Sequence, residues 1–511
     1  LRNPHVQRIR LAELSRQAGE RLVQQVLGAS ATRSTVEQIV ERSTGNPLYL
    51  EELIRAAVAG KREQTPETLL AMLQARLLGL SPDLRHVLRA ASVFGTTFWR
   101  GGVQLLLGGV PAALLDEWLH ALVASEVIEP HRTSQIAGEA QLGFRHVLMR
   151  DAAYSLLLDE DLRLGHRLAA QYLLSVGVHA PQVLAEHFER SGDTTAAARQ
   201  YLLAAQLAHR TSDTSGALAL AHRGLAGELP EALRGELLGL VCQVYLWRNE
   251  LATAGAYVDD VLRRVPAGSQ AWAVAVATQI VGSRLDDPVL FHASLERART
   301  IDPVADASGV LAFALMLGVF MLDFSGQFGR AEPYLLRLHD LVEPLEAEEP
   351  LARAWLHRAH AHREAWAHAA PALGLWHAEA ASESFRLAQF RRGHGVAQTL
   401  CGMNAWLLGD LARAERELHE ALQYGDELGL LSPLRTSFLA RVRIELGRPD
   451  EAEELARRMV EAAALRDAPL LAGLGHAAWS AAALARGDLE RAAGAIEAAL
   501  PCLRQAPLEH T

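Results

Sequence analysis

Apolar residues recur every three or four positions from about residue 190 onward, with no convincing alternation of period two. This spacing predicts an array of amphipathic helices. Within the array, a glycine or small polar residue is repeatedly followed five positions later by an alanine. The copies are Gly192/Ala197, Asn249/Ala254, Gly326/Ala331, Gly409/Ala414, Gly447/Ala452 and Gly487/Ala492. Because glycine lets a helix stop and alanine lets two helices approach closely, the phrase predicts stacked helical hairpins.

The spacing of the phrase indicates a repeat protein. Its last three copies begin about 40 residues apart, and the usual tetratricopeptide repeat (TPR) has a period of about 34 residues. The phrase resembles the longer TPR variety found in maltose-regulator-type transcription activators, over residues 181–505. This resemblance implies a solenoid that binds partners on its concave face. A non-repetitive helical domain is the alternative.

The first 180 residues have a different pattern. Alternation predicts a short strand over residues 6–11, and two apolar triplets at 127–129 and 142–144 predict a small β-hairpin around a polar stretch. Helical spacing predicts helices over residues 12–27, 35–42, 48–59, 66–80, 82–94 and 114–125. Three helices followed by a hairpin are typical of a winged-helix module. The expected fold is therefore mainly all-α, with a winged-helix module and then an α-solenoid of TPR-like hairpins.

The candidate recognition helix of this module, residues 112–125, carries Asp116 and Glu117 and contains no lysine or arginine. Glu126 and Glu129 follow it. An acidic helix does not enter the major groove of DNA, and the chain has a net charge of −10. We therefore expect no direct nucleic-acid contact and a regulatory role within the chain.

Three segments resemble STAND-class signalling ATPases, which are relatives of the AAA+ ATPases. Residues 39–53, which include Ser43-Thr44-Gly45-Asn46-Pro47, are similar to the signature of the helical lid, and residues 84–95 and 144–154 are similar to the winged-helix segments. The resemblance covers nearly the whole chain. It implies the end of an ATPase core plus a lid over residues 1–65, a winged-helix regulatory domain over 66–180, and TPR-like repeats over 181–505.

The resemblance also implies a switch, in which bound nucleotide holds the core, lid and winged helix together while the repeats sense an inducer or a protein partner. In this family the Gly-x-Pro element packs against adenine, which corresponds to Gly45 and Pro47. Glycine permits close backbone approach and proline offers a rigid apolar face. A plain helix-breaking turn is the alternative.

A winged-helix histidine contacts the phosphates of ADP in many members of the family. The comparable position is His146, with Arg145 beside it, and either side chain can make a charge-assisted contact to a phosphate. The residue order in this chain departs from the usual Met-His-Asp. A histidine packed at the exit of the wing is the alternative.

The chain contains one lysine, Lys61, so 49 of its 50 basic residues are arginines. Arg55 and Arg62 occupy positions around Lys61 where a Walker A loop needs glycine and serine or threonine. A kinase lysine and a Schiff-base lysine are excluded as well. We therefore expect no ATP hydrolysis by this chain alone, and no catalytic residues.

The chain begins at Leu1 in the middle of a pattern, so we expect it to be a piece of a longer protein. ATP or ADP, with Mg²⁺, would bind only together with an upstream ATPase core. The family joins this tail to kinase, cyclase or DNA-binding domains, so the output, whether transcription regulation or kinase signalling, stays open.

Three widely spaced cysteines, Cys242, Cys401 and Cys502, favour a reducing cytoplasm. The longest apolar run, residues 310–322, is shorter than a membrane span and predicts a buried helix. We expect a cytoplasmic protein with no membrane contact.

Histidines crowd one stretch of the array, at His357, His360, His362 and His368. His357 and His360 lie one helical turn apart, but no carboxylate or cysteine evidently completes a ligand set, so we expect no metal site. The sequence leaves two hypotheses: the sensory part of a nucleotide-switched signalling ATPase, or a non-catalytic TPR scaffold for protein–protein interaction.

Overall fold

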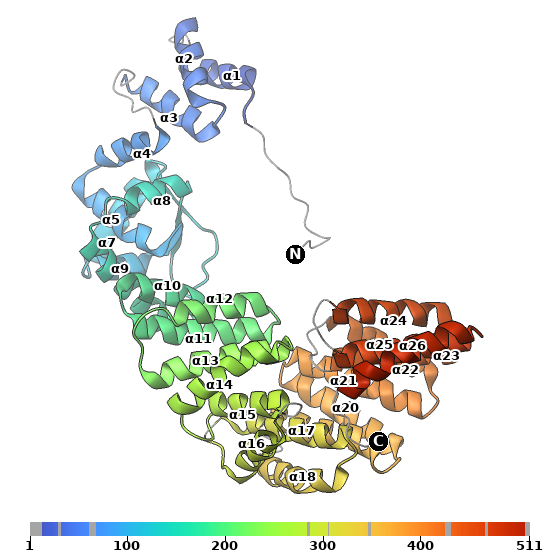
Figure 1. Cartoon of the computed structure of the whole chain (residues 1–511). Helices are drawn as coiled ribbons and strands as arrows, with labels where there is room; N and C mark the ends of the chain where they lie inside the picture. Colours follow the sequence, from blue (N-terminus) through green and yellow to red (C-terminus); the bar gives the residue numbers. More distant parts are fainter. Residues whose placement is uncertain are drawn as a thin grey trace. The chain divides into compact units, whose positions relative to one another are not determined.

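The computed structural model describes residues 13–28, 32–60, 68–283, 287–304, 306–345, 349–424, 431–464 and 469–505. Within these residues it contains 26 α-helices and three short strands, which confirms a mainly all-α fold (Figure 1). The chain divides into two compact units, Leu1–Asp193 and Thr194–Thr511. The strand expected over residues 6–11 and Lys61 lie outside the described residues.

Three helices begin the first unit: α1 (Arg16–Leu27), α2 (Arg33–Ser43) and α3 (Pro47–Val58). The side chains of Ser15, Thr32 and Asn46 accept hydrogen bonds from backbone N–H groups in the first turns, so each helix has a polar N-cap. The helices predicted over these segments are confirmed. Their shared core consists of buried apolar side chains such as Val23, Ile39 and Leu53.

A helical module with a small sheet follows. Its elements are α4 (Leu69–Leu78), α5 (Pro82–Phe94), β1 (Thr97–Trp99), α6 (Arg100–Leu106), α7 (Ala112–Ala124), β2 (Ile128–Pro130), β3 (Gln141–Phe144), α8 (Val147–Tyr154), α9 (Asp159–Ser175) and α10 (Pro181–Ser191). The predicted hairpin is confirmed as β2 and β3, with Glu129 opposite Gly143. The sequence pattern missed β1, which pairs with β3 and completes an antiparallel sheet of order β1-β3-β2. A three-residue strand is too short to show an alternating pattern.

The expected boundary between residues 180 and 181 falls between α9 and α10, and the division of the chain comes after α10. A buried contact helps to hold α10 against α9 in the first unit. Nδ1 of His166 on α9 lies 2.9 Å from Nδ1 of His187 on α10. The hydroxyl of Tyr154 lies 2.8 Å from Nε2 of His166.

The second unit consists of helical hairpins stacked in sequence order. Its helices are α11 (Thr194–Arg210), α12 (Thr214–Gly224), α13 (Glu231–Trp247), α14 (Leu251–Arg264), α15 (Gln270–Ser283), α16 (Pro288–Thr300), α17 (Ser308–Phe324), α18 (Phe328–Val342), α19 (Pro350–Trp366), α20 (Pro371–Leu387), α21 (Arg391–Leu407), α22 (Leu411–Ala421), α23 (Leu431–Glu445), α24 (Pro449–Ala464), α25 (Pro469–Ala485) and α26 (Leu489–Gln505). A short 3₁₀ turn, η3 (Glu343–Leu345), follows α18. The predicted solenoid of TPR-like hairpins is confirmed.

The repeated phrase has the geometry that its residue types predict. The first residue of all six copies has a positive φ, from +58° at Asn249 to +83° at Gly192, and the alanine five positions later is buried in every copy. Two further copies have no glycine at the turn: Ser212, which precedes buried Ala217, and Ala369, which precedes buried Gly374. Ser212 and Ala217 fit the phrase of a small polar residue followed by an alanine, whereas the copy at Ala369 departs from it at both positions.

Helix α17 contains the apolar run of residues 310–322 and is buried along almost its whole length. None of the described helices is both long enough and apolar enough to cross a membrane. The rings of Trp247, Phe313 and Trp355, from α13, α17 and α19, pack in series with centroid distances of 5.6 and 4.7 Å.

Helices distant in sequence also meet inside this unit. Arg392 on α21 is 1% exposed, and its guanidinium lies 3.2 Å from His209 Nδ1 on α11 and over the ring of Trp247. Phe390 packs against the same Trp247 ring. Side chains therefore fill the space between α11, α13 and α21.

Because the alanine of each copy is buried, a larger side chain at this position should destabilise the fold. Replacing Ala414 with leucine on α22 would overfill the contact with α21 and lower the free energy of unfolding by about 1–3 kcal/mol. Leucine at the exposed Ala412, on the same helix, should change it by less than about 0.5 kcal/mol. Urea unfolding followed by circular dichroism compares the two variants, and equal losses would contradict this account of the phrase.

The buried histidine pair predicts a pH dependence of stability. Burial, with a contribution from nearby positive groups, lowers the pKa of His166 to about 3 and that of His187 to about 4 from the ordinary 6.5. Below pH 6.5 the unfolded chain takes up protons that the folded pair excludes, so the free energy of unfolding falls as pH decreases, by about 1.4 kcal/mol per pH unit for each histidine. Urea unfolding at pH 7 and pH 5 should show a weaker dependence for His187→Gln. An unchanged dependence in that variant would refute the assignment.

Candidate functional site

Gly45 lies at the turn between α2 and α3, against the segment that enters α1. Thr44 and Gly45 both have positive φ, +51° and +78°, and the N–H of Leu14 donates to the carbonyl oxygen of Gly45 at 2.9 Å. A Cβ atom at position 45 would lie 2.9 Å from the Cβ of Glu13 and 3.0 Å from the carbonyl oxygen of Leu14. Both the turn and the close approach therefore require glycine.

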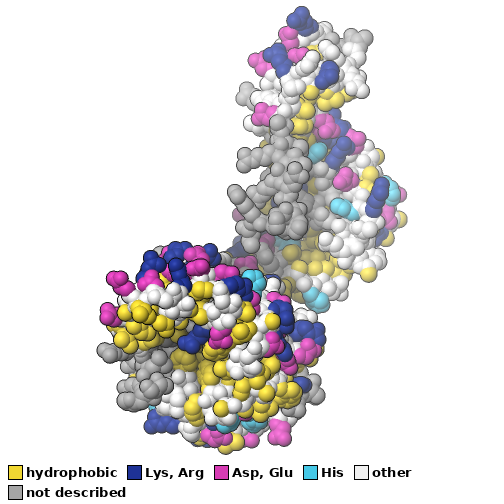
Figure 2. Space-filling view, turned by 90° about the vertical axis from the view of Figure 1, so that its right-hand side faces the viewer, with side chains coloured by type: hydrophobic (Ala, Val, Ile, Leu, Met, Phe, Trp, Pro, Cys, Tyr) yellow, Lys and Arg dark blue, Asp and Glu magenta, His cyan; other side chains and the backbone are white. Residues whose placement is uncertain are grey.

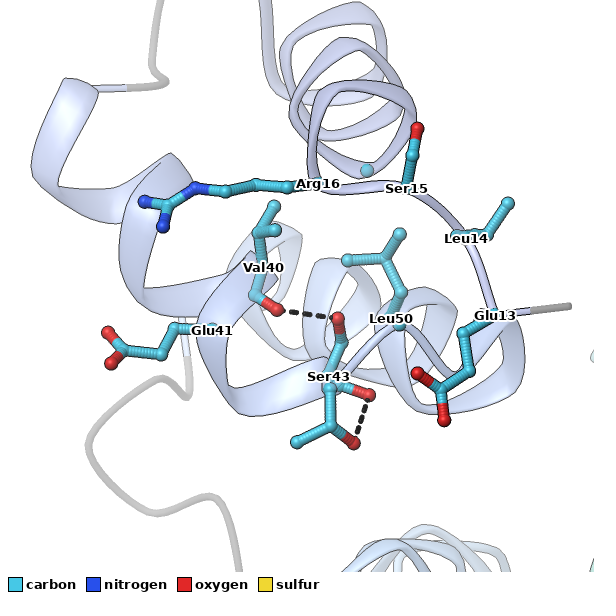
Figure 3. A pocket seen from close by; sticks show the side chains of 11 residues that line it. Glu13, Leu14, Ser15, Arg16, Val40, Glu41, Ser43 and Leu50 are labelled. Carbon is cyan, nitrogen blue, oxygen red and sulfur yellow. Dashed lines mark hydrogen bonds between the residues drawn. The ribbon is translucent and has the colours of Figure 1, made fainter.

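This turn borders a cavity of about 250 Å³ (Figure 3). The apolar side chains of Val40 and Leu50 line its inner part, while Glu13, Arg16 and Glu41 lie around it. The complete set of lining residues is Glu13, Leu14, Ser15, Arg16, Gly19, Val40, Glu41, Ser43, Thr44, Gly45 and Leu50. Such a mixed lining of apolar and polar groups is typical of small-molecule pockets.

Pro47 does not line this cavity. It is the first residue of α3 and is exposed, and the preceding Asn46 caps the helix by accepting from the N–H of Tyr49 at 3.2 Å. Proline at this position leaves no helical N–H unpaired, which accounts for its place in the motif without a ligand.

Arg145 and His146 lie at the end of β3, near the acidic residues of α3. The guanidinium of Arg145 pairs with the carboxylate of Glu126 at 3.2 Å, and Arg55 of α3 pairs with the same carboxylate. Arg55 also pairs with Glu51 at 2.8 Å. A chain of alternating charges thus joins α3 to the loop before β2.

The pKa values of the two carboxyl groups reflect this arrangement. For Glu51 partial burial acts to raise the pKa, but the hydrogen bond from Arg55 and the nearby Arg145 and His146 outweigh it, so the pKa is lowered. The hydrogen bond from Arg55 lowers the pKa of Glu126. Both groups therefore stay ionised well below neutral pH.

A second set of contacts also links α3 to the loop before β2, through Arg76 of α4. Arg76 of α4 pairs with the buried carboxylate of Glu52 and donates to the carbonyl oxygen of Ser125 at 2.7 Å. His146 has a buried Nε2 with no hydrogen-bond partner among the described residues. The structure thus places Gly45 on the cavity, and Arg145 and His146 beside Glu51 of α3, outside the cavity lining.

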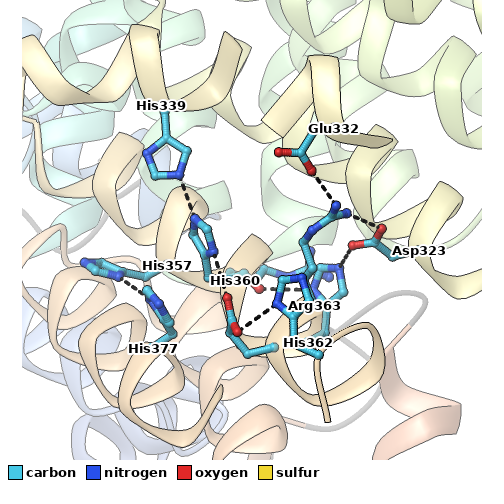
Figure 4. A network of polar contacts seen from close by, with 11 residues as sticks. Asp323, Glu332, His339, His357, His360, His362, Arg363 and His377 are labelled. Carbon is cyan, nitrogen blue, oxygen red and sulfur yellow. Dashed lines mark hydrogen bonds and ion pairs between the residues drawn. The ribbon is translucent and has the colours of Figure 1, made fainter. Parts of the chain in front are cut away.

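A group of histidine and carboxylate side chains lies elsewhere, in the repeats. His357, His360 and Glu364 of α19 lie near His339 of α18 and His377 of α20 (Figure 4). Burial, together with neighbouring cationic groups and histidines, lowers the pKa of His357, His360 and His377 to about 4, so these imidazoles are neutral at pH 7.

Sequence reasoning found part of this group only. The sequence shows that His357 and His360 lie one helical turn apart. His339 and His377 belong to other helices, so only the folded structure brings them to this group. Glu364 is the carboxylate that the sequence pattern did not connect to these histidines, although it lies one helical turn after His360.

A separate ionic network lies beside the histidines (Figure 4). The fully buried Asp323 of α17 lies 2.7 Å from the guanidinium of Arg363 and 3.3 Å from Nε2 of His362. Arg363 also pairs with Glu332 of α18 at 2.6 Å. These contacts connect α17, α18 and α19, and they compensate the buried charge of Asp323.

No family model and no curated protein matches this chain. Among solved structures, it is similar to the crystal structure of PH0952 from Pyrococcus horikoshii, a Signal Transduction ATPase with Numerous Domains (STAND) protein with a tetratricopeptide repeat sensor. The TM-score is 0.56 at 13% sequence identity, and the match covers 97% of this chain and 74% of the other. The P58(IPK) TPR domain matches with a TM-score of 0.20 at 12% identity, over 68% of this chain and 99% of that domain.

The similarity to the STAND protein concerns the fold. It extends over almost all of this chain, and it agrees with the helical hairpins described above. The chain therefore contains TPR-like helical repeats.

The charge chain between α3 and the sheet predicts a local change in dynamics. In Glu126→Gln, Arg55 and Arg145 lose their shared carboxylate, and we expect amide hydrogen exchange in α3 to become about two- to fivefold faster, as for the loss of a partly exposed ion pair. Exchange measured by mass spectrometry on residues 47–58 tests this.

Glu129→Gln is the matched control for this experiment. Glu129 is exposed and lies in the same hairpin, on β2. Equal effects of the two substitutions on α3 would show that the shared carboxylate does not hold the helix.

Proposed function

We propose that this chain is the regulatory and sensory part of a nucleotide-switched signalling ATPase, whose repeats bind an inducer or a protein partner. The observation that carries the proposal is the fold similarity to a STAND protein with a TPR sensor, which spans nearly the whole chain. In this proposal the hydrolytic core and the output domain lie outside residues 1–511.

In the first unit, α1–α3 would form the lid and the following module would be a winged helix. The order helix, strand, two helices and hairpin, from α5 to β3, supports this assignment. The acidic α7 favours a regulatory winged helix over one that binds DNA.

ATP or ADP would bind with Mg²⁺ only together with the ATPase core. The cavity at Gly45 would receive the adenine, because its apolar wall suits a flat ring and the carboxylates around it can accept from an exocyclic amine. Pro47 would cover the nucleotide only if the core closes over the start of α3, since its side chain is exposed.

The phosphates of the nucleotide would bind to the side chains of Arg145 and His146. Nε2 of His146 has no hydrogen-bond partner among the described residues, and Arg145 forms an ion pair with the exposed carboxylate of Glu126. A phosphate would compete with Glu126 for Arg145, and this exchange would couple nucleotide binding to the contact between α3 and the sheet.

The repeats would supply the sensor. Hydrophobic side chains gather on the face of the repeat unit seen in Figure 2. Exposed large apolar residues of this unit include Leu373, Trp376, Leu407, Leu484 and Leu489. Exposed aromatic and aliphatic side chains of this kind are typical of protein-binding surfaces.

A TPR scaffold without nucleotide is the second candidate. The position of Pro47 away from the cavity and the ion pair that already occupies Arg145 favour it. The two candidates differ in whether the site residues influence nucleotide affinity.

Substitution of Gly45 separates them. In the full-length protein, Gly45→Ala should weaken ADP binding about tenfold, because the added methyl group displaces residues 13–15 from the cavity. Fluorescence titration with N-methylanthraniloyl-ADP measures the affinity. Gly409→Ala is the control, since it has a similar φ of +80° but no atom within 4 Å of the new Cβ.

His146→Ala should weaken ADP binding about tenfold in the same assay, through loss of one charge-assisted contact. If neither Gly45→Ala nor His146→Ala changes ADP affinity, the nucleotide switch is wrong and the scaffold is the better account.

A further inference from the structure

The histidine group of the repeats has the composition of a transition-metal site, independently of the function proposed above. His357, His360 and Glu364 follow one another at turn spacings along one face of α19, and His339 and His377 approach from α18 and α20 (Figure 4). Three successive helices thus direct imidazole and carboxylate groups to one place.

Three of these residues have ligand atoms that converge. Each of His360, Glu364 and His377 offers one potential ligand atom, and these three atoms lie within 4.8 Å of one another. Nδ1 of His360 is buried, has no hydrogen-bond partner among the described residues, and lies 3.6 Å from Oε1 of Glu364. An ion between these groups would satisfy that nitrogen.

The distance between two of the rings also suits one shared ion. The centroids of His360 and His377 are 4.7 Å apart and their planes differ by 19°. Two imidazoles bound to one tetrahedral Zn²⁺, at about 2.0–2.1 Å each, place their ring centres about 5 Å apart. The two rings are stacked in the structure, so binding of one ion would require the rings to rotate until a free nitrogen of each points at a shared position.

The remaining nitrogens of both rings already have partners that would orient them. Nε2 of His360 lies 2.7 Å from Nε2 of His339, and Nδ1 of His377 lies 3.0 Å from Nδ1 of His357. Metal-binding histidines commonly have such a second contact, which determines the tautomer and the direction of the ring. The other oxygen of Glu364 lies 2.9 Å from Nδ1 of His368.

We propose that His360, Glu364 and His377 bind one divalent transition-metal ion of the Zn²⁺ class, with His339 and His357 orienting the two ligating imidazoles. Two imidazoles and one carboxylate suit Zn²⁺ better than Mg²⁺ or Ca²⁺, which prefer oxygen ligands. The ion connects α19 to α20. His360 and His377 are only partly buried, so a water molecule or an external ligand completes the coordination.

The test uses the protein without a histidine tag, after removal of metal by a chelator. Zinc chloride titrated in competition with a chromophoric chelator should show one site per chain with submicromolar affinity. The double variant His360→Gln/His377→Gln should bind at least about 100-fold more weakly, and the orienting variant His339→Gln about tenfold more weakly. Excess Mg²⁺ or Ca²⁺ should not displace the ion.

Matched controls are His222→Gln on α12 and His419→Gln on α22, since both histidines are exposed and lie outside the group. These variants should bind Zn²⁺ like the unmodified chain. Circular dichroism verifies the folding of every variant, and Glu364→Gln supplies a second ligand substitution if the double variant unfolds.

X-ray absorption at the zinc edge should show two imidazoles and one carboxylate oxygen at about 2.0–2.2 Å. The proposal is overturned if the chain binds no stoichiometric zinc, or if the folded ligand variants bind it as tightly as the controls do.

Discussion

Close packing between consecutive antiparallel helices is the constraint on which the repeat unit depends. One helix of a hairpin has too little apolar surface to be stable alone, so each must bury a face against its neighbours. The turn residue in a left-handed conformation reverses the chain, and the small residue five positions later brings the next helix close. Where the small residue is Gly374, the added Cβ would lie only 2.4 Å from Oδ1 of Asn404, so even alanine is too large there.

The interior of the repeat unit also contains charged groups. Helix α17 is surrounded on all sides, and Asp323 at its end is fully buried with Arg363 and His362. Arg392 is buried between α11, α13 and α21, beside His209 and Trp247. Buried charges require close partners, so these contacts specify which helices meet.

In the first unit, ion pairs link α3 to the segments that flank the hairpin of β2 and β3. Arg55, Glu126 and Arg145 form a partly exposed chain of charges, and Arg76 with Glu52 forms a more buried one. Exposed ion pairs contribute little stability and are easily exchanged for other anions.

The sequence by itself determined the helical content, the hairpin of β2 and β3, and six copies of the repeat phrase, because these depend on residues close together in the chain. It also indicated the turn at Gly45, because a positive φ and the close approach of another backbone segment both require glycine at that position. Tertiary structure alone decided that Pro47 lies outside the cavity, that Glu126 pairs with Arg145, and that β1 joins the sheet. It also brought His339 and His377 to His360 and Glu364. These contacts join residues on different helices and strands, and their register depends on how whole elements pack, which local spacing does not encode.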